Sequence, residues 1–599
     1  MRPPHSRWRS AMDDRAPGRS RTPVAAVRDS SLGLAKALNG LRNSLPREPL
    51  RAGANAASML VLGTAVEPGM ALRDSVSVPN PAAMAGWSVR ARLELLLEVL
   101  AMSGRHTTDA AAGSPVTDAP MTLSTEDIPA PRSIRVLRSE IDLRMTQATP
   151  EQWWLAYAVV SGTLPTVTSV SECCRRAQLR GPWAALRLPR RMAAMVGPGR
   201  QVDVVVGRVI VDVHHTAHTD LATGIQRVAR ATTRRWVAEH GADVVLTGWD
   251  DDYRTLRRLS AAEQATALYA DQPPDAVPQQ PAVVPWRGTY VIPELAVEPP
   301  RTARMQALAY HNLAETAVIG FDCVPVSSGE TVGTGMGPAF ARNLAAVRHM
   351  DRVATISGGA AREYRGWARM LAGAGLRGPR IEPVLLPATA EQATDAALQQ
   401  VREQYLIGSL PMMLVVGSHE PRKNHLAVLA AAEQLWHEGL DFSVLFVGGN
   451  SWNSDRFTDR VQQLRVAERP VATVSGMPDE QLWAAYRLAH VSVFPSLNEG
   501  YGLPVAESLA CGTPAITSQF GSMAEIAAGG GALLVDPRND ESIATAMRRT
   551  LTEPELLARL RAECAARPQG SWDDYARTTW GFLVGGIRPQ EQAGPDGAA

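Results

Sequence analysis

Residues 491–511 read VSVFPSLNEGYGLPVAESLAC, and they join a predicted strand to a predicted helix. The run VSVFPS is rich in β-branched and aromatic side chains, which is typical of a buried strand. Gly500 and Gly502 permit backbone conformations that other residues avoid. Pro504 suits the first turn of a helix. A strand, a glycine loop and a helix in this order are the building unit of a parallel α/β sheet.

The same alternation of strands and helices extends over two long regions of the chain. The first begins at VDVVVGRVIVDV (202–213) and the second at MMLVVG (412–417). Apolar runs of this length between helices are typical of a parallel sheet covered on both faces. We therefore predict an α/β fold with two doubly wound, Rossmann-like lobes that face a cleft. Ligands in such folds bind at the carboxyl ends of the strands, so each lobe would contribute half of one site.

Composition changes along the chain predict five segments. They are a mostly disordered extension rich in Ala, Pro, Ser and basic residues (1–87), a helical module with a linker that runs to about residue 130 (88–200), an N-terminal lobe (201–395), a C-terminal lobe (396–585) and a disordered tail (586–599). Within the module, EQWWLAYAVV (151–160) predicts a helix that ends at GTLP. Within the N-terminal lobe, the Pro-rich stretch DQPPDAVPQQPAVVP (271–285) predicts a loop insertion.

Composition also narrows the class of protein. The 599 residues exceed a single core, and a net charge of +1 argues against a general nucleic-acid binder. No apolar run reaches the ~20 residues of a membrane-spanning helix, and the N-terminus shows no secretion signal. The five scattered cysteines suit a reducing cytoplasm. Residues 1–50 carry ten basic and four acidic residues, which fits a solvated tail better than an arm on anionic lipid.

The segment that follows strand 491–496 has the groups to bind a phosphorylated ligand. Backbone N–H groups at the start of the helix attract phosphate. Glu507, one turn into the helix, can accept hydrogen bonds from the paired hydroxyls of a ribose, and Glu499 in the loop can bind a second polar group. Arg422 and Lys423 precede another helix, where anions also bind. Lys423 is one of only two lysines among 61 basic residues, so we expect its geometry to be functional.

These residues resemble the retaining glycosyltransferases of family 4, of the "glycosyl transferases group 1" type, which have the two-lobed GT-B fold. The resemblance covers about residues 205–585 and is strongest over 411–540. It depends on the Glu-x7-Glu spacing around Gly-x-Gly-Leu-Pro, on the upstream Pro-Arg-Lys-Asn, and on GTPAITS after the helix. Many members carry an arginine directly after the glycine of VVG, where this chain has Ser418.

The resemblance implies a role for each matching residue. Lys423, with Arg422 beside it, would bind the diphosphate of a nucleotide-sugar. Glu499 would contact the transferred sugar, and these three residues are the predicted catalytic set. The predicted donor-binding residues are Glu507, Gly502, Leu503 and Gly224.

Two features of the first lobe belong to the same resemblance. Gly224 lies in TGIQRV (223–228), which is similar to the family's N-terminal glycine loop and to a branch active on mannose-type sugars; an ordinary helix start fits equally well. In IGFDCVPV (319–326), many members have histidine where this chain has Phe321. Asp322 then becomes the acceptor-side candidate, although an aspartate that caps a turn explains it as well.

Two polar clusters in the sequence allow both a ligand-binding and a structural interpretation. His214, His215 and His218 form His-His-x-x-His, but no cysteine or carboxylate in the sequence pattern completes a zinc site. Residues 249–252, Trp-Asp-Asp-Asp, could bind a cation or stack on an acceptor sugar, and a surface turn explains them better.

The resulting hypothesis is a retaining hexosyltransferase that moves a sugar, of mannose type, from a nucleoside diphosphate sugar to a hydroxyl. Its expected setting is the assembly of a cell-surface polysaccharide or glycolipid. We expect no metal cofactor, a sugar, lipid-linked or glycan acceptor, and no nucleic-acid partner. The expected location is the cytoplasm, with contact to the inner face of the membrane left open. The alternatives are a sugar-nucleotide epimerase of the same fold and a non-catalytic pair of lobes that binds sugars or partners.

Overall fold

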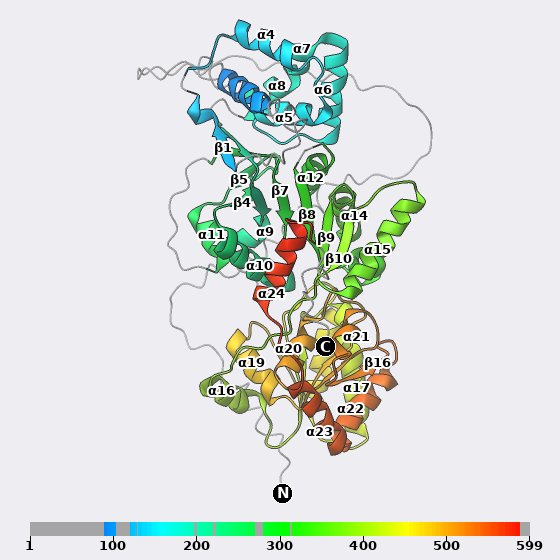
Figure 1. Ribbon diagram of the computed structural model, residues 1–599. Coiled ribbons are helices and arrows are strands. Elements are labelled where there is room, and N and C mark those ends of the chain that lie inside the picture. The colour runs from blue at the N-terminus through cyan, green and yellow to red at the C-terminus, as the bar shows by residue number, and fades with distance from the viewer. Residues whose placement is uncertain are drawn as a thin grey trace, which may run out of the picture. The chain divides into compact units, whose positions relative to one another are not determined.

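The computed structural model describes residues 89–102, 120–128, 130–196, 200–219, 223–269, 280–311 and 314–587 (Figure 1). These residues all belong to one compact unit. The predicted extension of residues 1–87 lies outside the described residues, as does most of the predicted tail of residues 586–599.

The predicted helical module consists of six helices in the described residues. They are 89–102, α4 (Ile134–Arg144), α5 (Pro150–Ser161), α6 (Val167–Arg180), α7 (Pro182–Ala185) and α8 (Arg187–Val196). Helix α5 confirms the prediction from EQWWLAYAVV: a capping box at Thr149 begins it, and Gly162 ends it with a φ of 69°. Its Trp153 and Trp154 are buried at the centre of the module.

The linker prediction is wrong at one place, because residues 121–124 form a strand. This strand, β1 (Met121–Ser124), pairs antiparallel with β2 (Val202–Val206) at the edge of the N-terminal sheet. Within the module, buried Arg92 donates hydrogen bonds to the carbonyl oxygens of Val160, Ser161 and Arg200, the last of which lies just before β2. The module is therefore joined to the lobe by backbone pairing as well as by chain connection.

The N-terminal lobe is built on a ten-stranded sheet with the order β1-β2-β6-β5-β4-β3-β7-β8-β9-β10. The remaining strands are β3 (Val209–Asp212), β4 (Val244–Trp249), β5 (Leu256–Arg258), β6 (Ala282–Trp286), β7 (Thr289–Ile292), β8 (Glu315–Gly320), β9 (Arg352–Thr355) and β10 (Arg380–Pro383). From β3 the sheet is parallel outward through β7 to β10, and on the other side to β4.

Two sequence predictions for this sheet need correction. The run VDVVVGRVIVDV is two strands, because Gly207 takes a φ of 68° between them; β2 and β3 are separated in the sheet by three other strands. The Pro-rich stretch 271–285 is not a loop throughout, because residues 282–286 form β6, whose five side chains are all buried. Burial on both faces outweighs the presence of a proline in this strand.

The N-terminal lobe also contains helices, which alternate with these strands along the chain. In chain order they are α9 (His214–Ala217), α10 (Gly224–His240), α11 (Ala261–Leu268), α12 (Pro299–His311), α13 (Val324–Ser327), η2 (Gly329–Thr331), α14 (Met336–Val347) and α15 (Gly358–Gly373). The last helix, α24 (Trp572–Leu583), falls within the predicted C-terminal lobe, yet it packs on α10 and β9 of the N-terminal lobe (Figure 1). Its Ala576 carbonyl accepts a 2.9 Å hydrogen bond from the buried Trp236 indole.

The C-terminal lobe is built on a six-stranded parallel sheet with the order β13-β12-β11-β14-β15-β16. Its strands are β11 (Met412–Val416), β12 (Ser443–Val447), β13 (Val471–Val474), β14 (Val491–Phe494), β15 (Ala515–Ser518) and β16 (Ala532–Val535). Its helices are α16 (Asp395–Tyr405), η3 (Pro421–Lys423), α17 (His425–His437), α18 (Asp455–Val466), α19 (Asp479–Leu488), α20 (Leu503–Ala510), α21 (Gly521–Ala527), α22 (Asp540–Thr552) and α23 (Pro554–Ala565).

The order of strands places a ligand site between β11 and β14. The chain first winds outward from β11 to β13, then returns and winds the other way from β14 to β16. Such a reversal leaves a crevice at the carboxyl ends of the two central strands. The two sheets confirm the predicted fold class, α/β with two doubly wound, Rossmann-like lobes.

Candidate active site

The loop between β14 and α20 takes the shape that its glycines permit. Gly502 has a φ of 109° and caps the N-terminus of α20. A Cβ on Gly500 would lie 2.3 Å from the carbonyl oxygen of Phe321, so no larger residue fits there. The Ser357 hydroxyl donates a 2.5 Å hydrogen bond to the Gly500 carbonyl. The glycine loop of the C-terminal lobe is thus held directly against the N-terminal lobe.

Glu499 lies between two cations at the carboxyl end of β14. Its carboxylate is 2.6 Å from Arg422 Nη1 and 2.6 Å from Lys423 Nζ, and it accepts a 2.8 Å hydrogen bond from the Ser496 hydroxyl. Burial alone would raise the pKa of Glu499, but Arg422 and Lys423 outweigh it and lower the pKa to about 2. The carboxylate is therefore fully ionised at neutral pH.

Arg422 and Lys423 have different surroundings. The Arg422 guanidinium also donates to the Asn498 carbonyl at 2.8 Å and to Glu420 at 2.7 Å, so most of its donors are engaged in holding the loop. Lys423 Nζ contacts Glu499 and lies 4.9 Å from the centre of the Phe494 ring. Its side chain is 12% exposed. Lysine has three donors, so Lys423 can bind Glu499 and a ligand anion together.

Glu507 is held at the other end of the same segment. Its side chain is nearly buried, 2.7 Å from Arg227 Nη1, and it accepts a 3.1 Å hydrogen bond from the Tyr486 hydroxyl. Burial outweighs Arg227 and raises the pKa of Glu507. The side chain of Arg227 is 35% exposed, so a ligand can approach this ion pair from the Arg227 side.

Arg227 comes from the N-terminal lobe and was given no role in the sequence analysis. It lies near the start of α10, three residues after Gly224. A Cβ on Gly224 would be 3.4 Å from a methyl group of Leu503, so the glycine loop of the first lobe meets the start of α20. The structure thus brings the predicted donor residues Gly224, Leu503 and Glu507 together. The signal that could have found Arg227 is its place, one turn into the helix that follows this loop.

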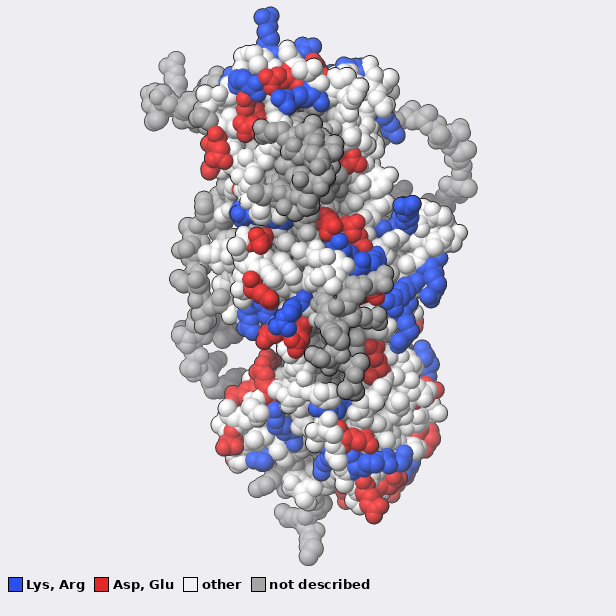
Figure 2. All heavy atoms as spheres, in the orientation of Figure 1, with Lys and Arg blue, Asp and Glu red and all other residues white. Residues whose placement is uncertain are grey.

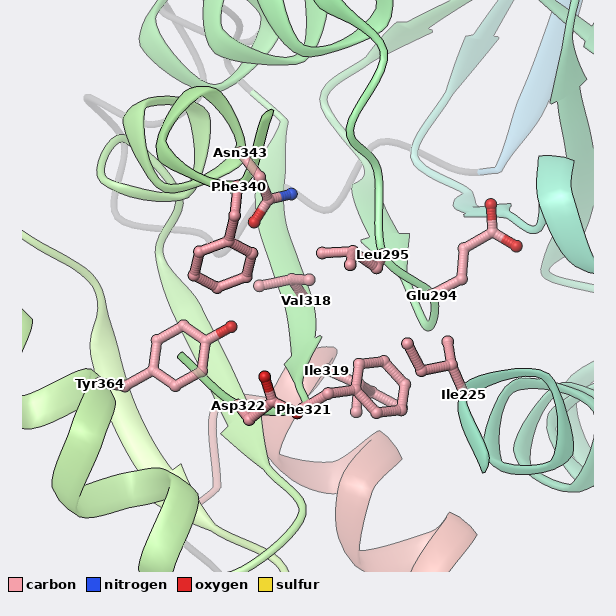
Figure 3. A pocket seen from close by; sticks show the side chains of 10 residues that line it. All are labelled: Ile225, Glu294, Leu295, Val318, Ile319, Phe321, Asp322, Phe340, Asn343 and Tyr364. Atoms are coloured by element: carbon pink, nitrogen blue, oxygen red, sulfur yellow. The ribbon is translucent and has the colours of Figure 1, made fainter. Parts of the chain in front are cut away.

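The acceptor-side candidate, Asp322, lines a pocket of the N-terminal lobe (Figure 3). The pocket is lined by Ile225, Glu294, Leu295, Val318, Ile319, Phe321, Asp322, Phe340, Asn343 and Tyr364. Burial raises the pKa of Asp322 to about 6, against the opposing effect of Arg422. Asp322 also accepts a 3.1 Å hydrogen bond from Val324 N. This hydrogen bond is the turn cap that the alternative interpretation of Asp322 predicts.

Glu294 borders this pocket but belongs to a separate buried cluster. Its carboxylate points away from the other labelled side chains in Figure 3. It accepts hydrogen bonds from His215 N and Thr216 N, each at 2.9 Å, and pairs with Arg301 at 2.8 Å. Arg301 also pairs with Asp212 at 3.0 Å, and its side chain is fully buried. This cluster fixes α9, the short helix that follows β3.

The three histidines after β3 are engaged with protein groups. His215 lies 2.6 Å from Glu298, and His218 lies 2.8 Å from Glu263. His214 accepts a 3.0 Å hydrogen bond from Trp249 N. Among the residues that the structure describes, no group of three or more His, Cys, Asp or Glu side chains is arranged to hold a metal ion.

In the Trp-Asp-Asp-Asp stretch, Trp249 ends β4, and Asp251 and Asp252 lie in the turn that follows. The Trp249 side chain is buried and donates a 2.7 Å hydrogen bond to Asp212, so it presents no face to an acceptor sugar. Asp250 accepts hydrogen bonds from the backbone of Arg254 and Thr255. The acceptor-stacking interpretation of Trp249 is therefore wrong.

Comparison with known proteins shows which family the C-terminal part of the chain resembles. Residues 399–566 match the family model described as Glycosyl transferases group 1, and this segment holds Arg422, Lys423, Glu499 and Glu507. Residues 399–566 are thus similar to the group 1 glycosyltransferases, which confirms the resemblance drawn from the motifs of this segment.

Individual relatives cover parts of the chain. The serotype-specific mannosyltransferase WbdA of Escherichia coli is 24% identical over 330 residues, which cover 53% of this chain and 40% of that protein. The D-inositol 3-phosphate glycosyltransferase of Acidothermus cellulolyticus is 35% identical over 173 residues, which cover 27% of this chain and 38% of that protein. The chain therefore spans less than half the length of these relatives. Among solved structures, sucrose-phosphate synthase from Thermosynechococcus elongatus aligns with 62% of this chain and 97% of its own, at 17% identity and a TM-score of 0.45.

Proposed function

We propose that the protein is a retaining glycosyltransferase that moves a hexose from a nucleoside diphosphate sugar to a hydroxyl group. The observation that carries the proposal is the position of Lys423. Its ammonium group lies 2.6 Å from Glu499, within the segment that matches the glycosyltransferase family model. A compact cation at this place is suited to a diphosphate, and Glu499 holds it in position.

The leaving group of the reaction is a nucleoside diphosphate, which gains negative charge as the glycosidic bond breaks. Lys423, Arg422 and the positive end of the α20 helix dipole supply positive potential where that charge develops. These groups can carry the diphosphate charge without a metal ion, and we propose none. We assign no nucleophile, because retention is proposed from the family resemblance.

The other predicted residues complete the donor site. Glu499 accepts hydrogen bonds from hydroxyls of the transferred sugar. Glu507 binds the ribose, which requires Arg227 to share or leave the carboxylate that it now holds at 2.7 Å. Gly224 and Gly502 let the backbone approach the donor closely, with Leu503 beside them.

We assign the acceptor to the pocket beside Asp322. The pKa of this carboxyl, raised to about 6, leaves it ionised at neutral pH and ready to accept a proton from a hydroxyl. The name of WbdA, a serotype-specific mannosyltransferase, favours mannose as the sugar. We also propose polysaccharide or glycolipid assembly as the setting and the cytoplasm as the location.

A ligand panel tests this function. We expect one nucleoside diphosphate sugar to raise the thermal unfolding midpoint, since a ligand that binds only the folded state stabilises it. The same compound should be hydrolysed slowly without an acceptor, and NMR should show a released sugar of unchanged anomeric configuration. Lys423→Ala is the matched control and should abolish both effects.

Two outcomes would contradict the proposal. An epimerised sugar formed without acceptor would identify a sugar-nucleotide epimerase. The absence of any stabilising nucleotide-sugar would favour a non-catalytic pair of lobes.

A further inference from the structure

The helical module carries an excess of positive charge that the whole chain does not have. Between residues 134 and 196 there are nine arginines and four acidic residues, whereas the whole chain has a net charge of +1. Figure 2 shows basic side chains around the end of the molecule where α4 and α7 lie, with uncharged surface between them and some acidic side chains nearby. A local excess of one sign attracts a partner of the opposite sign.

The same module exposes large apolar side chains to an unusual degree. Leu179 is 81% exposed and Leu143 is 79% exposed, the two highest values among the large apolar side chains that the structure describes. Leu143 lies at the end of α4 and is followed by Arg144; Leu179 lies at the end of α6 and is followed by Arg180. Each exposed leucine therefore stands next to an arginine.

These two helix ends are brought together by contacts at the start of α7. Asp142, next to Leu143, accepts a 2.9 Å hydrogen bond from Trp183 N, four residues after Leu179. The guanidinium of Arg190 lies 4.1 Å from the centre of the Trp183 ring.

Further arginines surround Arg190. Burial lowers the pKa of Arg190, and the neighbouring charges of Arg138 and Arg187 lower it further. Three arginines thus lie close together and repel one another, although Arg138 is also 3.7 Å from the carboxylate of Asp142. An anionic partner at this surface would relieve the repulsion.

The residues concerned are exposed arginines and leucines on α4, α6 and α8. We call them the basic end, and they are Arg138, Leu143, Arg144, Leu179, Arg180 and Arg187. We propose that the basic end binds the surface of an anionic lipid bilayer. Leucines inserted at the headgroup boundary, with arginines at the phosphates around them, suit a bilayer better than a nucleic acid, which offers no apolar phase.

Because the module is attached to the N-terminal lobe, a bilayer bound at the basic end would lie at a fixed distance from that lobe. The module is joined to this lobe by the β1–β2 pair and by packing of α5 and α6 on α12. In the described residues no helix is long and apolar enough to cross a membrane. Contact through the basic end would bring the N-terminal lobe, which holds the acceptor pocket of the proposed function, close to the surface of the bilayer.

Vesicle sedimentation with the full chain tests this inference, without any sugar donor. The probes are vesicles of phosphatidylcholine alone and vesicles of equal parts phosphatidylcholine and phosphatidylglycerol. We expect the protein to sediment with the anionic vesicles only, and high salt to release it. The variants Leu143→Asp with Leu179→Asp, and Arg180→Glu with Arg187→Glu, should each reduce the partition coefficient at least about tenfold, since one basic residue near such a surface contributes about 1 kcal/mol.

The matched controls lie on α18 of the C-terminal lobe. Val466 is 75% exposed and Arg456 is also exposed. Val466→Asp and Arg456→Glu repeat the same chemical changes elsewhere, and both should leave vesicle binding unchanged. Unaltered thermal midpoints would show that all variants are folded.

Three results would overturn the proposal. They are a wild-type protein that ignores anionic vesicles, a basic-end variant that binds as well as wild type, and a dimer in light scattering that the basic-end substitutions dissociate while vesicles are not bound. None of these depends on transferase activity, so a failure of the proposed function would leave this test standing.

Discussion

Each lobe contains a cluster of buried charges, and the two clusters differ in their access to solvent. In the N-terminal lobe, Arg301 pairs with Asp212 and Glu294, and the three side chains are 0%, 0% and 1% exposed. In the C-terminal lobe, Glu499 pairs with Arg422 and Lys423, and these side chains are 9%, 15% and 12% exposed.

The difference separates a structural cluster from a binding site. The first cluster is closed, and its carboxylates accept hydrogen bonds from the backbone after β3. The second lies at the carboxyl ends of β11 and β14 beside the start of α20, where the strand order places a crevice. The nitrogen–oxygen distances of the ion pairs are similar in the two clusters. Only the second can exchange a protein contact for a ligand contact.

The largest expected effect comes from breaking the closed cluster. Arg301→Leu leaves Asp212 and Glu294 buried without their cation, and we expect a loss of about 3–5 kcal/mol in the free energy of unfolding. Denaturant titration measures it. Arg304→Leu, one turn along on the same helix, is the control and should cost far less. Equal stability of Arg301→Leu and wild type would show that the cluster does not hold the lobe together.

The next effect concerns the solvent-accessible cluster of Glu499, Arg422 and Lys423. Here a substitution should lower activity without destabilising the fold. Lys423→Ala should lower the transfer rate about 10²–10³-fold, since it removes a cation from the developing charge of the leaving group. We expect its thermal midpoint to stay close to that of wild type, because Glu499 keeps Arg422. Steady-state kinetics and a thermal scan on the same sample check both statements. Lys423→Arg should restore activity only in part, since a planar guanidinium replaces a compact ammonium.

A smaller effect, on donor binding, is expected for Arg227 and Glu507, the ion pair that joins the two lobes. Glu507→Gln should weaken donor binding about 10- to 100-fold, because hydrogen bonds to a charged group contribute about 1.5–3 kcal/mol. The double-mutant cycle with Arg227→Ala should give a coupling energy of about 0.5–3 kcal/mol. Glu541→Gln on α22 is the control. Strictly additive effects of Glu507→Gln and Arg227→Ala would refute a shared role in donor binding.

The last expected effect is a dependence of stability on pH. The pKa of Asp322 rises from its ordinary value of 3.8 to about 6 on folding. The folded protein therefore binds this proton more tightly than the unfolded chain. The stability that Asp322 contributes is fully present below pH 3.8 and is lost as the pH rises through 6.

Paired denaturant titrations of wild type and Asp322→Asn measure this dependence. The stability of wild type relative to the variant should fall across this range and stay constant at higher pH. A pH-independent difference would show that Asp322 keeps an ordinary pKa.

Much of the fold could be predicted from the sequence, because long apolar runs between amphipathic helices specify parallel sheets locally. The errors arose where tertiary context decided the outcome. Strand β1 lies in a linker of polar composition and forms through pairing with β2. Strand β6 contains Pro285, and burial on both faces maintains it. The break at Gly207 depends on a positive φ that the sequence pattern did not reveal.

In the candidate site, too, residues within local motifs could be predicted, whereas contacts set by the tertiary structure could not. Glu499, Lys423 and Arg422 could be assigned because each stands at a strand end or helix start within a recognisable motif. The contact between Arg227 and Glu507 joins residues far apart in the chain and from different lobes, so no local pattern predicts it. The closed cluster around Arg301 was missed for the same reason, since its members come from β3, the end of β7 and α12.

The central claim is that Lys423 and the start of α20 bind the diphosphate of the donor. Calorimetric titration of wild type and Lys423→Ala with matched nucleoside diphosphates and monophosphates tests it most directly. The account predicts that wild type binds one diphosphate more tightly than its monophosphate, and that Lys423→Ala removes this difference. A preference for the diphosphate that survives in Lys423→Ala would contradict the account.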